Sequence, residues 1–353
     1  MKAEEILSLP ELESLAQATM SAMTFGYVTG AAADELTLRA NVEDWQKLRL
    51  KPTILVDVSE LDLSVEIIGQ RLTMPIMLAP AAFHRLCHKE AELATVAGAN
   101  LAQAGMVMSS FGNEPIEKLA AMATQPLWFQ LYMVNRQIVE EMVLRAQSAG
   151  CKAFCVTVDT PVLGARHREV RNAFQLPDDC NLPNLNTGAL THRPTRGAIY
   201  SDLLNPKLTW KDIDWLCSFS KVPVLLKGVL NPEDAVRAAD HGLAGIIVSN
   251  HGARNLDTLP STAQALPRIA HKLQGRIPLL VDGGIRRGTD VLKALALGAS
   301  AVLVGRPYLY ALSIAGAAGV ARVMEILRTE LQMAMALTGK TRIKDIDKSV
   351  LWD

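Results

Sequence analysis

Eight short apolar runs recur along the chain, separated by longer stretches with helical periodicity. They are Ile76–Ala79, Met106–Met108, Leu127–Gln130, Ala153–Val156, Val224–Leu226, Gly245–Val248, Pro278–Val281 and Ala301–Val304. Each run is continuously apolar rather than alternating, as expected for parallel strands covered on both faces. Intervening segments such as Gln137–Ala149 are long enough to cross back as helices. Eight alternations of strand and helix predict an α/β fold consisting of a single TIM (β/α)8 barrel.

Two segments depart from this rhythm. Residues 1–70 are predicted to form an N-terminal extension, helical at first and then irregular. Between the fourth and fifth runs, Pro177–Pro206 is rich in Asn, Pro, Thr and Gly and has little periodicity. A loop after the fourth strand lies on the side of a barrel that carries active sites. We therefore predict one domain over residues 1–353, with residues 177–207 as an active-site loop that is either a mobile lid or a disordered insertion.

Composition narrows the function classes. The chain has 353 residues, of which 49% are hydrophobic, and its 36 basic and 36 acidic residues give a formal charge of zero. No basic excess favours nucleic acid, and no uninterrupted apolar run is long enough to favour a membrane partner. The five cysteines have no framework spacing, so Cys151 and Cys155 are interpreted as core residues, and a reducing, cytoplasmic location is expected. No metal site is predicted.

Polar residues follow nearly every predicted strand. After successive runs come Ser109 and Ser110, Gln130 and Tyr132, Thr157, Asp159 and Arg166, Lys227, Ser249, Asn250, His251 and Arg254, Asp282 and Arg286, and Arg306. The carboxyl ends of the strands meet at one end of a barrel. One convergent site is therefore the simplest explanation.

The last two strand ends resemble a phosphate site. Asp282–Arg286 contains Gly283 and Gly284, and Gly305 precedes Arg306. Glycine turns let backbone N–H groups approach an anion, and arginine adds charge-assisted donors. This pattern predicts a bound phosphate without deciding whether it belongs to the substrate or to a cofactor.

Two single residues allow several interpretations. Lys227 could extend from the barrel end to solvent, form a Schiff base or face a cofactor as a cation. His251 could be a hydrogen-bonded core histidine. It follows a strand end, however, with glycine next to it and Arg254 three residues on. We therefore favour a catalytic role for His251.

The segment Val248–Arg254 resembles the FMN-dependent family that oxidises L-2-hydroxy acids, which includes glycolate oxidase, lactate oxidase and mandelate dehydrogenase. The resemblance extends from about Phe25 to Met335. It rests on Tyr27 with Gly30–Asp34, Pro75–Pro80, Phe129–Tyr132, Thr157–Pro161, Leu225–Gly228, Asp282–Asp290, Lys293–Ala299 and Gly305–Pro307. These pieces are specific together, in this order and at barrel spacing.

The resemblance implies FMN across the top of the barrel. Its phosphate would be held by Asp282, Gly283, Gly284, Arg286, Gly305 and Arg306. Its ring and ribityl chain would be hydrogen-bonded by Pro80, Ala81, Ala82, Ser109, Gln130, Thr157 and Ser249. Lys227 would lie near flavin N1 and O2, where a cation favours the reduced ring.

The resemblance also implies the substrate and partners. Arg166 and Arg254 would bind the carboxylate of a 2-hydroxy acid, with Tyr27 and Tyr132 on its oxygens. His251 would take a proton from the substrate, and Asp159 would orient the imidazole. Oxygen would be the electron acceptor, giving hydrogen peroxide and a 2-oxo acid. Members of this family usually assemble as homotetramers or homo-octamers.

Two departures from the family pattern affect the prediction. Glycolate oxidases carry Trp where this chain has Phe111, a position near the substrate side chain. A smaller ring leaves more room, so we expect L-lactate, with glycolate as the close alternative. The loop between Asp178 and Leu208 keeps no motif that we recognise.

Other functions remain open at this point. A dehydrogenase of the same family would pass electrons to a quinone or cytochrome instead of oxygen. An FMN-barrel isomerase, or an aldolase with Lys227 as its Schiff base, would leave His251 and the two substrate arginines unexplained. A barrel retained only for binding or structure is disfavoured, because all the family's polar positions are filled.

Overall fold

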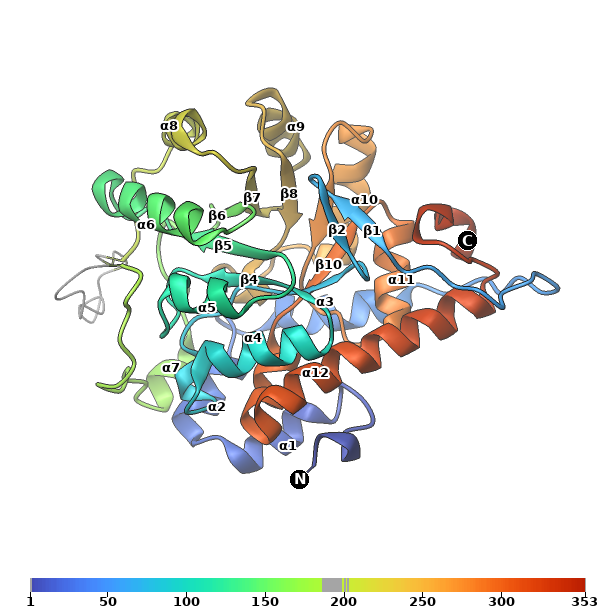
Figure 1. The fold of residues 1–353 in the computed structure, drawn as a ribbon, viewed down its shortest axis with the longest axis horizontal. Helices are drawn as coiled ribbons and strands as arrows, with labels where there is room; N and C mark the ends of the chain where they lie inside the picture. The colour runs from blue at the N-terminus through green and yellow to red at the C-terminus, as the bar shows by residue number, and fades with distance from the viewer. Residues whose placement is uncertain (1, 186–198, 200, 202, 353) are drawn as a thin grey trace.

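The computed structural model describes residues 2–185, 199, 201 and 203–352 (Figure 1). Its centre is a closed barrel of parallel strands in the order β10-β3-β4-β5-β6-β7-β8-β9. The strands are β3 (Ile76–Leu78), β4 (Gly105–Ser109), β5 (Leu127–Leu131), β6 (Phe154–Thr157), β7 (Val224–Val229), β8 (Gly245–Val248), β9 (Leu279–Val281) and β10 (Ala301–Val304). All eight predicted runs are strands, and the predicted TIM barrel is confirmed.

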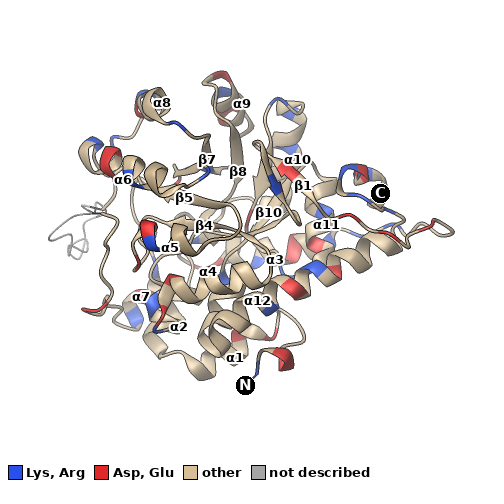
Figure 2. Ribbon diagram, viewed as in Figure 1, with Lys and Arg blue, Asp and Glu red and all other residues tan. Residues whose placement is uncertain are grey.

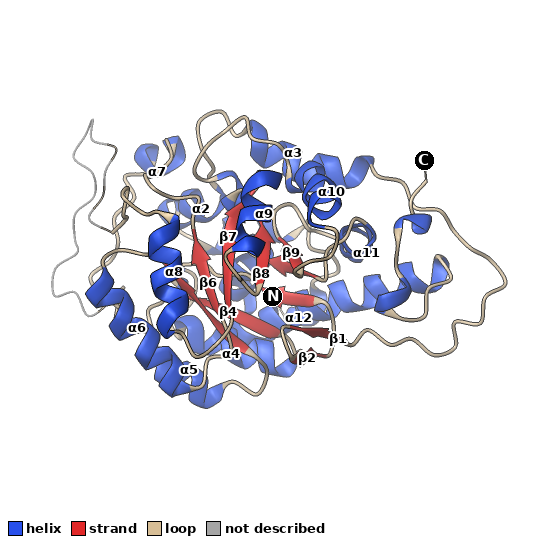
Figure 3. Ribbon diagram, turned by 90° about the horizontal axis from the view of Figure 1, so that it is seen from above, coloured by secondary structure: helices blue, strands red, loops and turns tan. Residues whose placement is uncertain are grey.

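A helix follows each barrel strand and lies outside the sheet (Figure 3). These helices are α4 (Ala91–Leu101), α5 (Ile116–Met122), α6 (Arg136–Ala149), α8 (Trp210–Phe219), α9 (Pro232–Asp240), α10 (Thr262–Leu273), α11 (Gly288–Ala296) and α12 (Arg306–Leu337). The periodic stretch Gln137–Ala149 is α6, whose first turn is capped by Asn135 through the N–H of Ile138. Charged residues are found chiefly on the helices and loops outside the barrel (Figure 2).

Alternation along the strands explains why each run is continuously apolar. One set of side chains, including Met77, Val107, Leu225 and Leu280, forms a buried cluster to which every barrel strand contributes. Such a cluster can only lie inside the barrel. The residues between them, such as Leu226, join the larger cluster shared with the helices. Both faces of every strand are therefore dry, as in other parallel sheets.

A hairpin that the sequence did not predict closes the amino end of the barrel. Strands β1 (Val65–Ile67) and β2 (Gln70–Leu72) pair antiparallel, and Ile67 and Leu72 are buried in the interior cluster. The indole N–H of Trp128 donates to Gln70 Oε1 at 2.8 Å. The hairpin therefore acts as a plug, and only the carboxyl end of the barrel is left for a ligand.

The N-terminal extension packs three helices against the barrel: α1 (Leu12–Thr19), α2 (Ala22–Thr29) and α3 (Leu36–Lys47). Short 3-10 turns complete the description: η1 (Ala3–Glu5), η2 (His84–Leu86), η3 (His251–Ala253), η4 (Ile343–Asp345) and η5 (Lys348–Val350). The predicted extension, helical and then irregular, agrees with the structure except for the hairpin.

Helix α12 is long and apolar enough to cross a membrane by length and composition alone. It instead packs against α1, α4 and α11, and just over half of its most apolar stretch is buried. Its path breaks at Ala315 and Gly316, where Gly316 has φ 56°. These contacts are those of a core helix in the barrel wall.

The predicted active-site loop, residues 177–207, is described only in part. A short helix α7 (His167–Arg171) precedes it. Its first residues pack on the barrel, since Asn184 Oδ1 accepts the N–H of Ile116 at 2.9 Å and its Nδ2 donates to the Glu114 carbonyl at 3.0 Å. Residues 186–198, 200 and 202 lie outside the described part of the chain, so the choice between lid and insertion stays a prediction, as does the assignment of residues 1–353 to one domain.

Candidate active site

The alternation that fills the barrel interior also builds its upper layer. Ser109, Gln130, Thr157, Lys227, Ser249 and Asp282 each lie two positions after an inward apolar residue, which are Val107, Trp128, Cys155, Leu225, Ile247 and Leu280 in turn. A period of two keeps side chains on one face of a strand. The six polar side chains therefore meet inside the carboxyl end of the barrel, and all six residues are buried.

These buried side chains satisfy one another in two groups. Ser109 Oγ donates to Gln130 Oε1 at 3.0 Å, and Gln130 Nε2 donates to Thr157 Oγ1 at 3.0 Å. On the other side, Lys227 Nζ lies 3.0 Å from both Ser249 Oγ and Asp282 Oδ2. The groups form a polar floor, with a cation at one end.

Lys227 is held as a cation. Burial opposes its charge, but Asp282 and Asp159 outweigh burial, so the pKa of Lys227 is raised. A Schiff-base lysine needs a lowered pKa, so this environment disfavours the aldolase. The side chain is 5% exposed, which also rules out extension to solvent. Among the earlier interpretations of Lys227, a cation facing a cofactor fits best.

Gly228 brings the next element close to this lysine. It has φ 105°, and the β7–β8 register shifts between Lys227 and Val229. A Cβ at this position would lie 2.5 Å from Asp159 Cγ. Only glycine permits both the backbone conformation and the approach of the Asp159 carboxylate.

His251 lies on a strained turn. It begins η3, and His251, Gly252 and Ala253 have φ values of 56°, 60° and 65°. The left-handed conformation costs a residue with a Cβ about 1–2 kcal/mol, so other contacts must hold this turn. Ser249 Oγ accepts the His251 N–H at 3.0 Å, and the Ala253 carbonyl accepts the N–H of Ala32 at 2.8 Å.

A buried amide pair supports the same turn. Asn41, on α3, and Asn250 exchange two hydrogen bonds of 2.9 and 2.8 Å between their side chains. Asn250 Oδ1 also accepts the Ala253 N–H at 3.3 Å. The N-terminal extension is thus attached directly to the turn that carries His251.

The His251 ring is oriented by a carboxylate. His251 Nδ1 lies 2.9 Å from Asp159 Oδ1, and Thr160 Oγ1 donates to the same carboxylate oxygen at 2.9 Å. This contact places the ring proton on Nδ1 and leaves Nε2, 3.4 Å from the Tyr132 hydroxyl, as the basic atom. Burial lowers the pKa of His251, although Asp159 acts in the opposite direction. A neutral imidazole beside a carboxylate can accept a proton.

Two arginines lie beside this base and share one carboxylate. Arg254 Nη2 lies 2.8 Å from Glu169 Oε1, and Arg166 Nη1 lies 3.4 Å from the same oxygen. Arg166 Nε donates to the Arg254 carbonyl at 3.1 Å. The Arg254 guanidinium also stacks over the Tyr27 ring, 4.8 Å from its centroid. The cluster has more guanidinium than carboxylate, so it suits an anionic ligand.

The C-terminus of α2 anchors arginines from two parts of the site. Arg254 Nη1 donates to the carbonyls of Tyr27 at 2.6 Å and Gly30 at 2.9 Å. Arg306 Nε and Nη2 donate to the carbonyls of Val28 and Gly30, both at 2.9 Å. Carbonyls at a helix C-terminus lack helical partners and carry partial negative charge. They therefore fix both guanidiniums and still leave their positive charges for ligands.

Aromatic rings form a wall next to the base. The Phe111 and Tyr132 rings stack at 4.8 Å, and Phe83 lies 6.3 Å from Phe111 and 5.8 Å from Tyr27. Phe174 stacks on Tyr27 at 4.6 Å. The wall gives the site an apolar side.

The two predicted phosphate arginines, Arg286 and Arg306, lie near each other and are each partly buried. Burial lowers the pKa of Arg306 to about 10, with Arg286 among the charges that contribute, and burial also lowers the pKa of Arg286. Within residues 2–185 and 203–352, no ion pair involves either one. Gly305 precedes α12, so the N-terminus of that helix faces the same place. Two partly buried guanidiniums that form no ion pair with the described residues, close to a helix N-terminus, would suit a phosphate.

The donor set fits FMN. Among the described residues, four buried polar atoms lack a hydrogen-bond partner, and three of them, Ser110 Oγ, Asp159 Oδ2 and Asp282 Oδ1, belong to residues that follow barrel strands. Buried polar atoms of this kind are expected to meet a ligand. Pro80, Ala81 and Ala82 follow β3 and are partly exposed at the rim. The upper layer could bind a polar ring and chain, and Gly283, Gly284, Arg286 and Arg306 its phosphate.

Sequence reasoning missed several residues that shape this site. They are Asn41, Phe83, Thr160, Glu169, Phe174 and Asn255, whose Nδ2 donates to Thr160 Oγ1 at 2.7 Å. Glu169 had a weak signal, because it lies three residues after Arg166 on a short helix. The others act through tertiary contacts that leave no local pattern.

Comparisons with known proteins bear on this geometry. A family profile described as FMN-dependent dehydrogenase matches residues 16–353. The chain belongs to this family. It is 44% identical to an L-lactate oxidase of Nostoc sp. over 98% of both chains, and 40% identical to the glycolate oxidase of Spinacia oleracea, covering 99% of this chain and 97% of that one. A structure of mandelate oxidase with (S)-4-hydroxymandelic acid aligns with a TM-score of 0.92 at 37% identity, covering 98% of both chains.

Membership of this family confirms the resemblance seen in the sequence. The protein is an FMN-dependent flavoprotein that oxidises 2-hydroxy acids, an (S)-2-hydroxy-acid oxidase. The expected cofactor, FMN, is confirmed. When bound, FMN supplies a ring that accepts two electrons from the substrate.

Proposed function

We propose that this enzyme oxidises L-lactate, with glycolate as a close second substrate, and reduces oxygen to hydrogen peroxide. One 2-hydroxy acid and one O2 give one 2-oxo acid and one H2O2. The observation that carries the proposal is a neutral, carboxylate-oriented His251 beside the Arg166 and Arg254 cluster. A base next to an anion site suits a carboxylate whose neighbouring carbon carries the reacting hydroxyl.

In the proposed mechanism the arginines bind and the histidine accepts a proton. Arg166 and Arg254 would pair with the substrate carboxylate and fix the position of its C2. His251 Nε2 would then take a proton from the substrate. Asp159 stabilises the resulting imidazolium. Burial raises the pKa of Asp159, but His251 and Lys227 lower it by more, so the net shift is downward. Asp159 therefore stays ionised and holds the Nδ1 proton throughout.

Tyr132 and Tyr27 would supply hydrogen bonds without competing as acids. Burial raises the pKa of both phenols, so both stay protonated at neutral pH. A protonated phenol can donate to a substrate oxygen. Tyr132 already lies 3.4 Å from the basic nitrogen of His251, so it is well placed to orient the hydroxyl that meets this nitrogen.

The preference for L-lactate rests on Phe111. Its ring is buried against Tyr132 and Phe83 and provides apolar surface without an N–H donor. A methyl group at C3 gains from such a surface, whereas glycolate has no C3. The relative named L-lactate oxidase, at 44% identity, supports the same choice. One contact of this kind discriminates by only about 1–3 kcal/mol, so glycolate stays a substrate.

The runner-up acceptor is a quinone or cytochrome. The relatives named above are oxidases, which favours oxygen. Turnover measured with oxygen and with a dye acceptor, at equal substrate, distinguishes the two. A dye rate far above the oxygen rate would contradict the oxidase.

The decisive experiment uses the purified, FMN-loaded protein. Anaerobic L-lactate should bleach the flavin and D-lactate should not, because the arginines and His251 fix one face of C2. In air, peroxide and pyruvate should form in equal amounts. A panel of glycolate, L-lactate and longer 2-hydroxy acids then ranks the substrates, and bleaching by none of them would refute the proposal.

Assembly and location also stay proposals. The resemblance supports a homotetramer or homo-octamer, and the free, mostly buried cysteines are compatible with a reducing cytoplasm. Sedimentation of the holoenzyme tests the first, and cell fractionation tests the second.

A further inference from the structure

The carboxylate of Glu169 is placed where a substrate anion would have to approach. Helix α7 begins one residue after Arg166 and carries Glu169 on its inner side. A single oxygen, Oε1, contacts Arg254 at 2.8 Å and Arg166 at 3.4 Å. The Glu169 side chain is 18% exposed and each arginine 14%, so solvent screens these charges only weakly.

The charges around this cluster are otherwise matched locally. Arg168 pairs with Glu35 at 2.6 Å. Lys227 lies between Asp282 and Asp159, beyond His251. Arg306, which shares the Gly30 carbonyl with Arg254, forms no ion pair within the described part of the chain and is assigned to the FMN phosphate. Arg166, Arg254 and Glu169 together therefore carry one net positive charge, the complement of one carboxylate.

We propose that Glu169 is a specificity-determining residue that restricts this enzyme to 2-hydroxy monocarboxylates and rejects 2-hydroxy dicarboxylates. The inference rests on the proposed function, since it concerns the acid bound by Arg166 and Arg254. A monocarboxylate neutralises the cluster. A second carboxylate on the substrate brings a further negative charge into the same poorly screened site, where the two arginines are already neutralised. Its repulsion by Glu169 therefore disfavours binding.

Binding of reaction products tests this without turnover. 2-Oxobutyrate and oxaloacetate have four carbons each and differ in one carboxylate, and neither is a 2-hydroxy acid that could reduce the flavin. Their dissociation constants would be measured by calorimetry on the FMN-loaded protein. The wild type should bind 2-oxobutyrate more tightly. In Glu169→Gln the ratio of the two constants should shift towards oxaloacetate by about tenfold or more.

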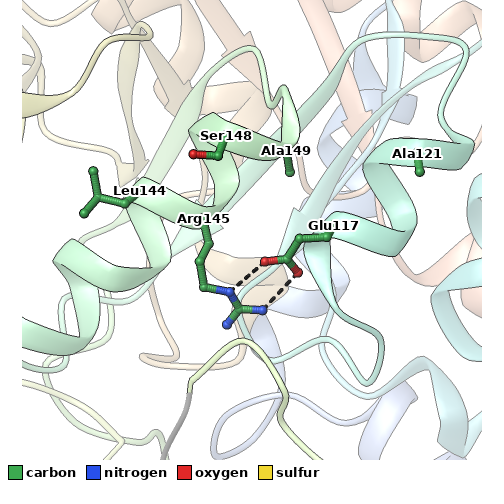
Figure 4. Close-up of a pocket in the computed structure, with 6 residues that line it drawn as sticks. All are labelled: Glu117, Ala121, Leu144, Arg145, Ser148 and Ala149. Carbon is green, nitrogen blue, oxygen red and sulfur yellow. Dashed lines mark hydrogen bonds and ion pairs between the residues drawn. The ribbon is translucent and has the colours of Figure 1, made fainter.

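Two variants separate charge from structure. Glu169→Asp keeps the charge and should keep the wild-type ratio. Glu117→Gln removes a carboxylate from a pair of the same kind between α5 and α6, where Arg145 Nε lies 2.7 Å and Nη2 3.0 Å from the Glu117 oxygens (Figure 4). It changes the net charge equally but faces outer helices, so it should leave the ratio unchanged.

The outcomes are distinct. An unchanged ratio in Glu169→Gln, or an equal shift in Glu117→Gln, would overturn the proposal, as would a wild type that binds neither keto acid. If both keto acids bind and the ratio shifts while no 2-hydroxy acid reduces the flavin, the proposed function fails and the role of Glu169 stands. As a second readout, kcat/KM for L-malate relative to L-2-hydroxybutyrate should rise in Glu169→Gln.

Discussion

The two ends of the barrel interior come from the same strands and the same alternation, yet they differ in chemistry. Near the amino end, Leu225 and Leu280 pack with the β1–β2 hairpin in a dry cluster. Two positions on, Lys227 and Asp282 form a buried ion pair of 3.0 Å. A step of about 7 Å along a strand thus separates a layer that stabilises the fold from one that can bind and react.

This difference teaches where mutations should act. Removing an apolar side chain from the lower layer leaves a cavity and costs stability. Changing the upper layer leaves the packing below it intact and alters ligand binding or proton transfer instead. Each substitution below tests whether stability and activity divide at this boundary.

The largest effect is expected for His251→Gln. Loss of a positioned base costs about 10²–10⁴ in rate, so the rate of flavin reduction should fall by this factor while FMN stays bound. Stopped-flow absorbance with anaerobic L-lactate measures the rate, and the flavin spectrum reports cofactor retention. Near-normal reduction would remove His251 from its proposed role.

Leu225→Ala should do the reverse. It removes a fully buried side chain from the lower layer and should cost about 2–5 kcal/mol of unfolding free energy. Below its unfolding transition, kcat per bound FMN should stay within about twofold of the wild type, because the upper layer is unchanged. Denaturant unfolding measures the stability, and steady-state kinetics on the same sample measure kcat. A large loss of kcat without a loss of stability would contradict the division between a stabilising lower layer and a functional upper layer.

Asp159→Asn should act through the histidine. Asp159 raises the pKa of His251 against the effect of burial, so its removal should lower that pKa further. The acid limb of the kcat/KM profile, expected below pH 6.5 in the wild type, should move to lower pH. The rate should also fall, because a charge-assisted hydrogen bond of about 1.5–3 kcal/mol to the imidazolium is lost. An acid limb that moves to higher pH would contradict this orientation.

Phe111→Trp should have the smallest effect. A larger ring in the aromatic wall takes space beside C3 of the substrate. The ratio of kcat/KM for glycolate to kcat/KM for L-lactate should therefore rise several-fold, which corresponds to about 1 kcal/mol. The substrate panel measures it, and thermal unfolding should change little. A ratio that moves towards L-lactate would place the substrate side chain elsewhere.

Much of the fold was predictable because its signals are local. Buried parallel strands must be apolar on both faces, so each strand could be recognised in the sequence as a continuous apolar run. The hairpin was not predictable, since Ile68 and Gly69 both have positive φ at its turn, where Asn-Gly is the usual signal. Its apolar side chains make sense only once a barrel exists for them to close.

The site was predictable to the extent that its residues follow strand ends. His251 and Asp159 follow strand ends and Lys227 lies in the last half of β7, and the barrel brings all three together. Asn41 could not be found in this way, because it lies 209 residues before its partner Asn250 in a helix with no chemical signature. Glu169 was also missed, since an acidic residue near arginines in a sequence is indistinguishable from an exposed pair.

The attachment of both guanidiniums to the end of α2 has a consequence for how the protein is made. The Gly30 carbonyl accepts from Arg254, 224 residues later, and from Arg306, 276 residues later. During synthesis α2 therefore emerges long before either arginine. Its terminal carbonyls stay hydrated until nearly the whole barrel has left the ribosome. Contacts this distant in sequence form late. The enzyme should acquire its binding sites for both ligands in one final step rather than strand by strand.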